Sequence, residues 1–430
     1  MSDTFPFTVP AAAATTVSAA AVATHTKRRA TDISGARLGR AMLSYIAVMM
    51  AIITLAPFRF AASPVHGLTP LWTWSDIVMN VVMFVPIGFL FQLTRPSGSL
   101  AKWWQVLLVG AALSGCIETA QLFEAERYSS LFDVLTNAIG AAVGAVLYAM
   151  VLKRMEGDNT VRTLALELPL MGLVYLLVPL MWLIGLASDG GSRAWLVLLV
   201  GAFAGGVLGT VHAAYLAPVR GVGRPWLLVA ALLWFVVAML PGAIRDRSVL
   251  LAGAAITVGV AWLRSIATAR ARAVAGNRRF ELATLRLVLP LFAAYLSLSS
   301  LWPLDGAGTV WHGTGALFDI GDAVSTSRIF LALEHVAAFT LVGYIIAEFH
   351  GRESLRYRDI AQRVTGWGAG ISMLLEATRG WHPNYGASLL MLILTIGASA
   401  FGGLLYQLQR DHVRALLTRR QPRGMRSITS

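Results

Sequence analysis

Seven polar residues recur at helical spacing along three long apolar stretches between residues 74 and 150. They are Asp76, Asn80, Glu118, Gln121, Arg127, Asp133 and Asn137. Members of a pair that are three or four residues apart lie on one face of a helix. Ionisable groups are costly in hydrocarbon, so they normally face a protein interior or a water-filled cavity and mark function. The sequence therefore predicts one polar site built from three membrane helices. Arg127 is expected to pair with Glu118 or Asp133. Asp76 and Asp133 also fall at predicted helix starts, where a carboxylate complements the helix dipole.

The chemistry of these residues favours binding over a specific reaction. Glu118 follows an apolar stretch and is the candidate catalytic residue, because a carboxylate there can act as a general base. The guanidinium of Arg127 suits phosphate or carboxylate, and the amides suit sugar hydroxyls. The sequence shows no nucleophile with a partnered base and no phosphate-binding loop. Enzymatic activity is therefore left open, and no cofactor is expected.

A metal site is a weaker alternative at the same place. Asp76, Glu118 and Asp133 offer oxygen ligands of the kind that hard divalent cations prefer. Their spacing is not that of a metal-binding motif, and the single cysteine, Cys116, adds no thiolate cluster. We therefore expect no bound metal.

The composition identifies a polytopic membrane protein. Hydrophobic residues make up 57% of the chain and charged residues 13%, with a mean hydropathy of +0.66. A helix needs about 20 mainly apolar residues to span a bilayer. Twelve candidate spans are centred near 41–58, 77–93, 104–122, 134–152, 164–187, 194–216, 225–239, 248–263, 282–301, 329–349, 364–375 and 387–408, of which the eleventh is short and rich in glycine. The predicted fold is an all-α bundle of about twelve spans.

Basic residues predict the orientation. Cytoplasmic loops carry an excess of Lys and Arg. With the N-terminus inside and twelve spans, 27 of the 35 Lys and Arg residues fall inside and seven outside. Both termini are therefore predicted to be cytoplasmic. The net charge of +13 is spread over short loops, so it indicates contact with anionic lipids and not with nucleic acid.

The spans divide into three groups between two tails. We expect a disordered cytoplasmic tail (1–40), a first four-helix unit (41–152), a middle four-helix region (164–263), a third unit (282–408) and a basic tail (409–430). The third unit weakly repeats the first at offsets of 255 and 258 residues. The repeat places His335, Glu376 and Arg379 opposite Asn80, Glu118 and Gln121. In the middle region, Gly201, Gly205 and Gly209 form a small-residue stripe that predicts close helix packing.

The first unit resembles the VanZ-like family of membrane proteins. The resemblance rests on three motifs, Asp76-x3-Asn80-x3-Phe84-x-Pro86-x-Gly88, Ser114-x2-Ile117-Glu118-x2-Gln121, and Arg127-x5-Asp133-x3-Asn137-x2-Gly140-x3-Gly144. It covers about residues 41–152, and residues 286–408 look like a degenerate second copy. The family is named for a protein associated with teicoplanin resistance, so the resemblance implies the bacterial inner membrane and a cell-envelope context. It implies no particular reaction.

Three functions fit this pattern. The first is binding or processing of an amphipathic envelope molecule at the outer membrane interface, such as a lipid-linked saccharide from an exopolysaccharide or peptidoglycan pathway. The second is a membrane scaffold in which the polar set joins helices. The third is a transporter or flippase. This function is favoured less, because transporter sites normally lie at the membrane midplane and the polar set lies near one interface. Membrane lipids are expected contacts, and protein partners are not identified.

Overall fold

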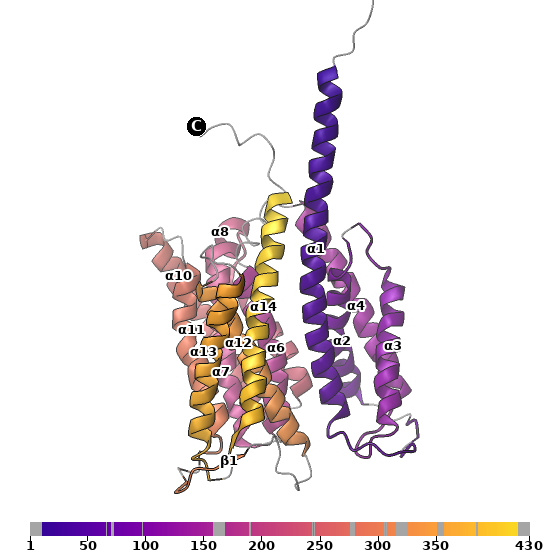
Figure 1. The fold of residues 1–430 in the computed structure, drawn as a ribbon. Helices are drawn as coiled ribbons and strands as arrows, with labels where there is room; N and C mark the ends of the chain where they lie inside the picture. The colour runs from indigo at the N-terminus through magenta and orange to yellow at the C-terminus, as the bar shows by residue number, and fades with distance from the viewer. Residues whose placement is uncertain are drawn as a thin grey trace, which may run out of the picture.

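The chain folds into a bundle of helices that run alternately up and down (Figure 1). The computed structural model describes residues 11–419 except 66, 70–72, 97, 158–167, 189–190, 243, 245, 276–279, 305, 307, 315–324, 351–356 and 384–385. Besides helices, the described residues contain one parallel pairing of two-residue strands, β1 (Gly313–Thr314) with β2 (Ala387–Ser388). The predicted all-α membrane bundle is confirmed.

Each of the twelve predicted ranges contains a helix. The long helices are α1 (Ala11–Leu55), α2 (Trp74–Leu93), α3 (Trp103–Gln121), α4 (Leu131–Gly157), α6 (Leu168–Ser188), α7 (Val197–Val211), α9 (Arg224–Met239), α10 (Arg247–Ala275), α11 (Phe280–Leu301), α12 (Thr326–His350), α13 (Tyr357–Arg379) and α14 (Leu389–Arg419). The short helical segments are η1 (Ser192–Leu196), η2 (His212–Leu216), α8 (Ala217–Arg220) and η3 (Leu240–Gly242).

Nine of the described helical segments are long and apolar enough to cross a membrane. The helices α3 and α13 are not among the nine, and the apolar part of α6, Gly172–Ser188, is shorter. The chain is therefore an integral membrane protein, and the count of twelve spans stays a prediction.

Two helices run past predicted boundaries. The predicted disordered tail 1–40 is helical from Ala11 onward, because α1 runs without a break into the first span. Its sequence is rich in alanine, which has the highest helix propensity. The predicted basic tail 409–430 is helical as far as Arg419. Residues 1–10 and 420–430 lie outside the described residues.

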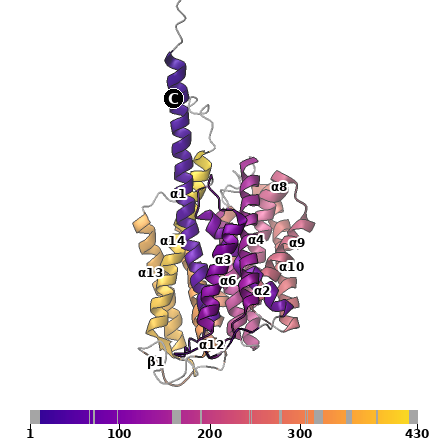
Figure 2. The ribbon, with the colours of Figure 1, turned by 90° about the vertical axis from the view of Figure 1, so that its right-hand side faces the viewer.

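Both ends of the described chain lie at one end of the bundle (Figures 1 and 2). The opposite end carries the end of α1 and the beginnings of α2, α4 and α12, and we call it the distal end. The basic residues predict that the distal end is extracytoplasmic.

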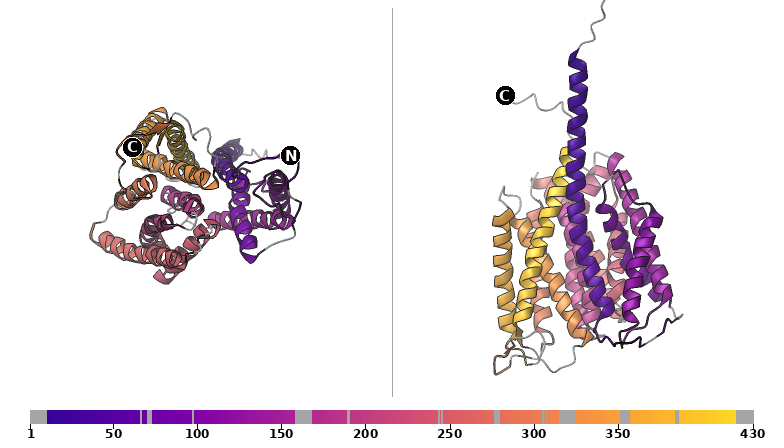
Figure 3. Two further views of the ribbon diagram at one scale, coloured as in Figure 1. Left: turned by 90° about the horizontal axis from the view of Figure 1, so that it is seen from below. Right: turned by 45° about the vertical axis from the view of Figure 1, so that its right-hand side comes forward.

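Seen along its axis, the bundle has three sectors that match the three groups of helices (Figure 3). The helix α6 and the spans that contain α7 and α12 form the buried centre. Leu177, Leu180 and Leu183 of α6 are inaccessible to solvent, and 78% of each of the two other spans is buried. A helix that is apolar on all sides is expected in such a central position. The helix α1 contacts α2 on one side and α14 on the other.

Glycines allow the closest helix contacts. A Cβ atom on Gly205 would overlap the carbonyl oxygen of Thr257 in α10, and one on Gly209 would overlap that of Ala261. This confirms the packing predicted from the small-residue stripe. Similar contacts join α2 to α4, where Gly88 meets the Ala141 carbonyl and Gly144 meets the Val85 carbonyl. These contacts set the distance between the two helices that carry Asp76 and Asp133.

A matched pair of glycine substitutions tests this packing. We expect Gly205→Ala to destabilise the protein by about 1–3 kcal/mol, because overpacking forces the α7 and α10 backbones apart. Gly259→Ala in α10 adds the same methyl group where nothing lies within 4 Å, so it should be neutral or stabilising. Thermal unfolding of the purified protein in detergent measures both. Equal melting temperatures for the two variants would contradict the packing argument.

Cysteine labelling tests the orientation. The native Cys116 is exposed, so the background is Cys116→Ser. We expect a membrane-impermeant maleimide to label Gly313→Cys in intact cells, and Arg358→Cys only after permeabilisation. Both positions are exposed, and α12 separates them. The reverse pattern would show that the distal end faces the cytoplasm.

Candidate functional site

Three of the predicted residues meet at the distal ends of α2 and α4. The Nδ2 of Asn80 donates a hydrogen bond to Oδ1 of Asp133 over 2.9 Å. Asp76 lies one turn before Asn80 and is close enough to Asp133 to interact electrostatically. All three side chains are half-buried. We call Asp76, Asn80 and Asp133 the acidic site.

Local sequence explains why these residues stand at helix starts. Thr73 caps α2 by accepting the Asp76 N–H over 3.2 Å, and Asp76 accepts the Thr73 N–H over 3.1 Å in return. Such a capping box satisfies two backbone donors that lack partners within the helix. Asp133 lies in the first turn of α4, where a carboxylate complements the helix dipole. Both positions were predicted as helix starts.

Glu118 and Asn137 join α3 to α4. The buried Glu118 accepts the backbone N–H of Ser130 through Oε2 over 2.7 Å, directly before α4 begins. Asn137 donates to the hydroxyl of Ser114 over 2.8 Å, and both side chains are buried. Glu118 therefore acts as a helix cap supplied by a neighbouring helix.

Gln121 and Arg127 bind the end of α1. Gln121 donates to the Thr54 carbonyl over 3.0 Å, and Arg127 donates to the carbonyls of Ala56 and Ile53 over 3.0 and 3.1 Å. The last carbonyls of a helix lack partners within the helix and attract cations. Burial lowers the pKa of the Arg127 guanidinium and the nearby carboxylates of Glu124 and Glu126 oppose this shift. An arginine nevertheless stays protonated.

The expected ion pair of Arg127 with Glu118 or Asp133 is wrong. Among the described residues, no carboxylate forms a salt bridge with Arg127. Sequence spacing placed these three charges at the same end of the bundle. The guanidinium instead bonds the last carbonyls of α1, which lack partners within the helix. The seven predicted residues therefore fall into three groups, of which the acidic site is the most accessible.

Two distal loops hold this arrangement in place. The loop after α1 exchanges backbone hydrogen bonds with the loop after α3, including Ala61 N–H to Phe123 O over 2.8 Å. Glu124 is fully buried between them and accepts the N–H groups of Arg59 and Glu126. Glu124 was not predicted as a site residue, because nothing in the neighbouring sequence distinguishes it from an ordinary loop residue. The cap before α4 was not predicted either, although Ser130 followed three residues later by Asp133 is a recognisable helix-start pattern.

The three residues predicted as second-unit counterparts lie at the distal ends of α12 and α13. Glu376 accepts the backbone N–H of Ser388 over 2.8 Å, and Arg379 lies 3.7 Å from its other carboxylate oxygen. His335 bonds the Leu331 carbonyl through Nδ1 over 2.8 Å and faces the Ser300 hydroxyl at 3.5 Å. In the described part of the chain, no three His, Cys, Asp or Glu side chains are grouped as metal ligands.

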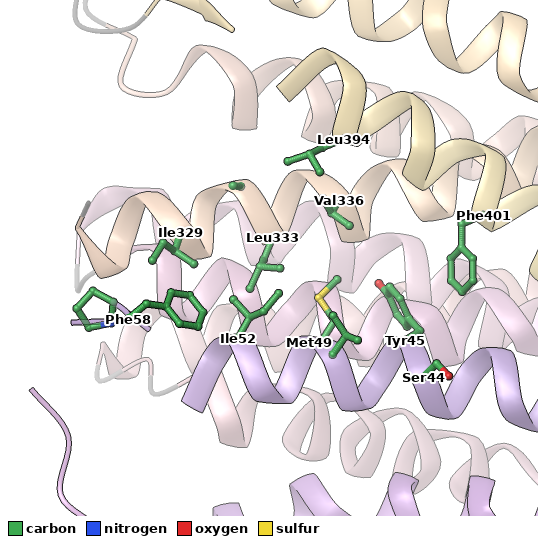
Figure 4. A pocket seen from close by; sticks show the side chains of 13 residues that line it. Ser44, Tyr45, Met49, Ile52, Phe58, Ile329, Leu333, Val336, Leu394 and Phe401 are labelled. Carbon is green, nitrogen blue, oxygen red and sulfur yellow. The ribbon is translucent and has the colours of Figure 1, made fainter. Parts of the chain in front are cut away.

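An apolar groove runs beside α1, on the side away from α2. Its volume is about 810 Å³. In Figure 4, Tyr45, Met49 and Ile52 of α1 face Leu333 and Val336 of α12 across this groove. The remaining lining comes from Ser44, Val48, Pro57, Phe58, Ile329, Ala332, Leu394 and Phe401. None of the predicted site residues lines this groove.

Comparison with known proteins identifies the family of the first unit. Residues 24–154 match the VanZ/LLP1 family, which confirms the resemblance and extends it upstream of residue 41. No curated protein and no solved structure matches the chain significantly. The matched residues include all seven predicted site residues, α1 from Thr24 onward, the whole of α2 and α3, and α4 as far as Arg154. The N-terminal unit of this integral membrane protein is therefore VanZ-like.

Proposed function

We propose that the VanZ-like unit binds the polar head of an amphipathic envelope molecule at the distal membrane surface. The main observation that supports this proposal is the acidic site. Asp76, Asn80 and Asp133 are half-buried, whereas Glu118, Gln121, Arg127 and Asn137 bond helix ends or neighbouring helices. A polar cluster that is accessible and held in place by its neighbours is suited to a ligand.

The chemistry of the acidic site narrows the ligand. Two carboxylates accept hydrogen bonds, and the amide of Asn80 has an acceptor oxygen besides the nitrogen that bonds Asp133. Sugar hydroxyls and ammonium groups donate such bonds. Arg127 is engaged by carbonyls, so we do not assign phosphate binding to this site. A lipid-linked saccharide, or a peptidoglycan precursor that exposes hydroxyl and amino groups, is the proposed ligand class.

The family match supports the bacterial inner membrane as the location. A lipid chain has a separate apolar site on the side of α1 away from the acidic site. The polar groups that line the apolar groove along α1 are the hydroxyls of Ser44 and Tyr45, and the other eleven lining residues are apolar. Its size is within the range of about 300–1,000 Å³ that small-molecule sites occupy. A hydrocarbon chain is the natural occupant of such a groove within a bilayer.

A scaffold function is the second candidate. It is favoured because Glu118, Gln121, Arg127 and Asn137 join neighbouring helices, as interhelical polar contacts do. We call these four residues the braces. A transporter is supported less, because the acidic site lies at helix starts and not at mid-span. Glu118 caps α4, so the proposed binding function requires no catalytic step from it.

We also propose that α11–α14 form a degenerate second copy of the VanZ-like unit. Glu376 and Ser388 form the same contact as Glu118 and Ser130. Ser372 bonds Thr395 as Ser114 bonds Asn137, and Gly343 meets the Ser399 carbonyl as Gly88 meets that of Ala141. Tyr344 and Tyr406 pack edge to face at 5.4 Å, as Phe89 and Tyr148 do at 5.2 Å.

Substitutions in the acidic site test the binding function. Asp133→Asn keeps an acceptor for Asn80 and removes the charge, and Asp76→Asn does the same at the neighbouring position. We expect about tenfold less co-purified saccharide lipid, the effect of losing a charge-assisted hydrogen bond. Mass spectrometry of lipids extracted from the purified protein measures this loss at normal membrane abundance.

The matched control is Asp246→Asn, which neutralises an exposed aspartate before α10, also at the distal end. It should retain the wild-type lipid complement. An unchanged complement in Asp133→Asn, or an equal loss in Asp246→Asn, would exclude the acidic site as the binding site.

Substitution of a brace should lower the stability of the protein, and not its ligand binding as in the acidic site. We expect Glu118→Gln to lower the free energy of unfolding by about 1–3 kcal/mol, because a neutral amide replaces the carboxylate that caps α4. Glu376→Gln should have a similar effect if the third unit is a second copy. Glu126→Gln removes an exposed carboxylate and should change stability by less than about 0.5 kcal/mol. If Glu118→Gln keeps wild-type thermal stability and loses the ligand, the Glu118 carboxylate is functional and not a brace.

A further inference from the structure

The apolar groove lies where the VanZ-like unit meets the third unit. One wall is α1, and the other comes from α12 and α14. All three helices contain segments that are long and apolar enough to cross a membrane, so the groove lies at the depth of the bilayer hydrocarbon. A buried water needs about two to four polar partners, and the described lining offers only the hydroxyls of Ser44 and Tyr45. The groove is therefore suited to hydrocarbon and not to water.

The groove ends near the middle of the membrane. Figure 4 shows Phe58 and Ile329 at its distal end, and Tyr45 and Phe401 at the other end. The rings of Tyr45 and Phe401 lie 5.6 Å apart, which narrows the groove there. Tyr45 precedes the end of α1 by ten residues, which is about 15 Å along a helix. Val336 follows the start of α12 by the same distance. Because a hydrocarbon core is about 30 Å thick, the groove covers its distal half.

The groove is open to the bilayer along its side. Ser44 and Val48 of α1 are exposed, and the exposed fraction of Val48 is 57%. Across the groove, Leu394 of α14 is 37% exposed. Lining atoms without a neighbour lose their van der Waals contacts, so a groove filled by hydrocarbon is more stable than an empty one. A lipid of the distal leaflet can enter from the side, without passing between helices.

We propose that the groove binds one acyl chain of a phospholipid from the distal leaflet, where this chain lies between the VanZ-like unit and the third unit. The chains of one leaflet extend from its surface to the midplane, which is also the extent of the groove. A chain from the opposite leaflet would have to pass the contact of Tyr45 with Phe401. The proposal rests on the lipid-chain site of the proposed function and adds the leaflet and the lipid class. It requires no ligand at the acidic site, because the two sites share no residue.

Photolabelling of the full-length protein in nanodiscs tests this proposal. Two phosphatidylcholines are used, with a diazirine either beside the carbonyl or at the end of one acyl chain. We expect the chain-end probe to label Tyr45 and Phe401, and the probe beside the carbonyl to label Phe58 and Ile329. The yield on these residues should be about tenfold higher than on the exposed face of α10, as for a chain that buries about two more methylene groups. The reverse order of the two probes would place the lipid in the opposite leaflet, and an equal yield on α10 would exclude a bound chain. Either result would overturn the proposal.

Two substitutions that fill the groove provide a second arm. Ala332→Phe adds a ring from α12, and Val48→Phe adds one from α1. We expect each variant to show about tenfold less chain-end labelling of Tyr45, because the added ring takes the volume of the chain. Thermal unfolding in detergent identifies the variants that fold, and either one is sufficient for the test. Undiminished labelling in a folded variant would overturn the proposal.

The matched control is Ala255→Phe, which adds the same ring at an exposed position eight residues after the start of α10, also in the distal half of the membrane. It should be labelled at Tyr45 as the wild type is, and a loss equal to that of Ala332→Phe would overturn the proposal. Asp133→Asn alters the acidic site and should leave the labelling unchanged. Normal labelling in Asp133→Asn supports the groove proposal whether or not this variant loses the saccharide lipid, so the two proposals can fail separately.

Discussion

The backbone groups at helix ends impose the constraint on which the distal end of this protein depends. A helix leaves its first N–H groups and last carbonyls without internal partners, and where protein or lipid excludes water each such group must find another partner. Here the partners come from neighbouring helices and loops. The Glu118 carboxylate accepts a hydrogen bond from the backbone N–H directly before α4, while Gln121 and Arg127 donate to the last carbonyls of α1. The same groups that satisfy the backbone thereby fix the relative positions of α1, α3 and α4.

This constraint explains why a polar set that resembled one binding site is divided. A carboxylate that caps a helix, or an arginine that binds carbonyls, has little remaining capacity for a ligand. Asp76 and Asp133 are within the first turns of their own helices, so they complement the helix dipoles from accessible positions. The glycines that bring α2 close to α4 also bring Asn80 to Asp133. The packing of apolar helix faces thus determines the geometry of the acidic site.

Much of this architecture was predictable because it depends on local sequence. Apolar length located the helices, the glycine stripe located the contact of α7 with α10, and Asp76 and Asp133 marked helix starts. The errors concern properties that a short window does not contain. The partner of Arg127 was wrong because its choice depends on how the two distal loops fold against each other. The buried pair of Arg193 and Glu334 was not predicted because these residues and Ser299 are brought together from distant segments, and in the sequence Arg193 is an isolated arginine beside an apolar stretch.

The buried pair of Arg193 and Glu334 extends the argument from one unit to the whole bundle. Placing two charges inside a membrane protein is costly, and hydrogen bonds to each partner reduce that cost. Tyr295 donates to Glu334 and the Ser299 carbonyl accepts from Arg193, so the pair joins η1 to α11 and α12. Those elements belong to the middle region and the third unit, and α1 in turn contacts α14 of the third unit. The VanZ-like unit is therefore one sector of a larger bundle, and its acidic site lies at the end where helices of all three groups begin.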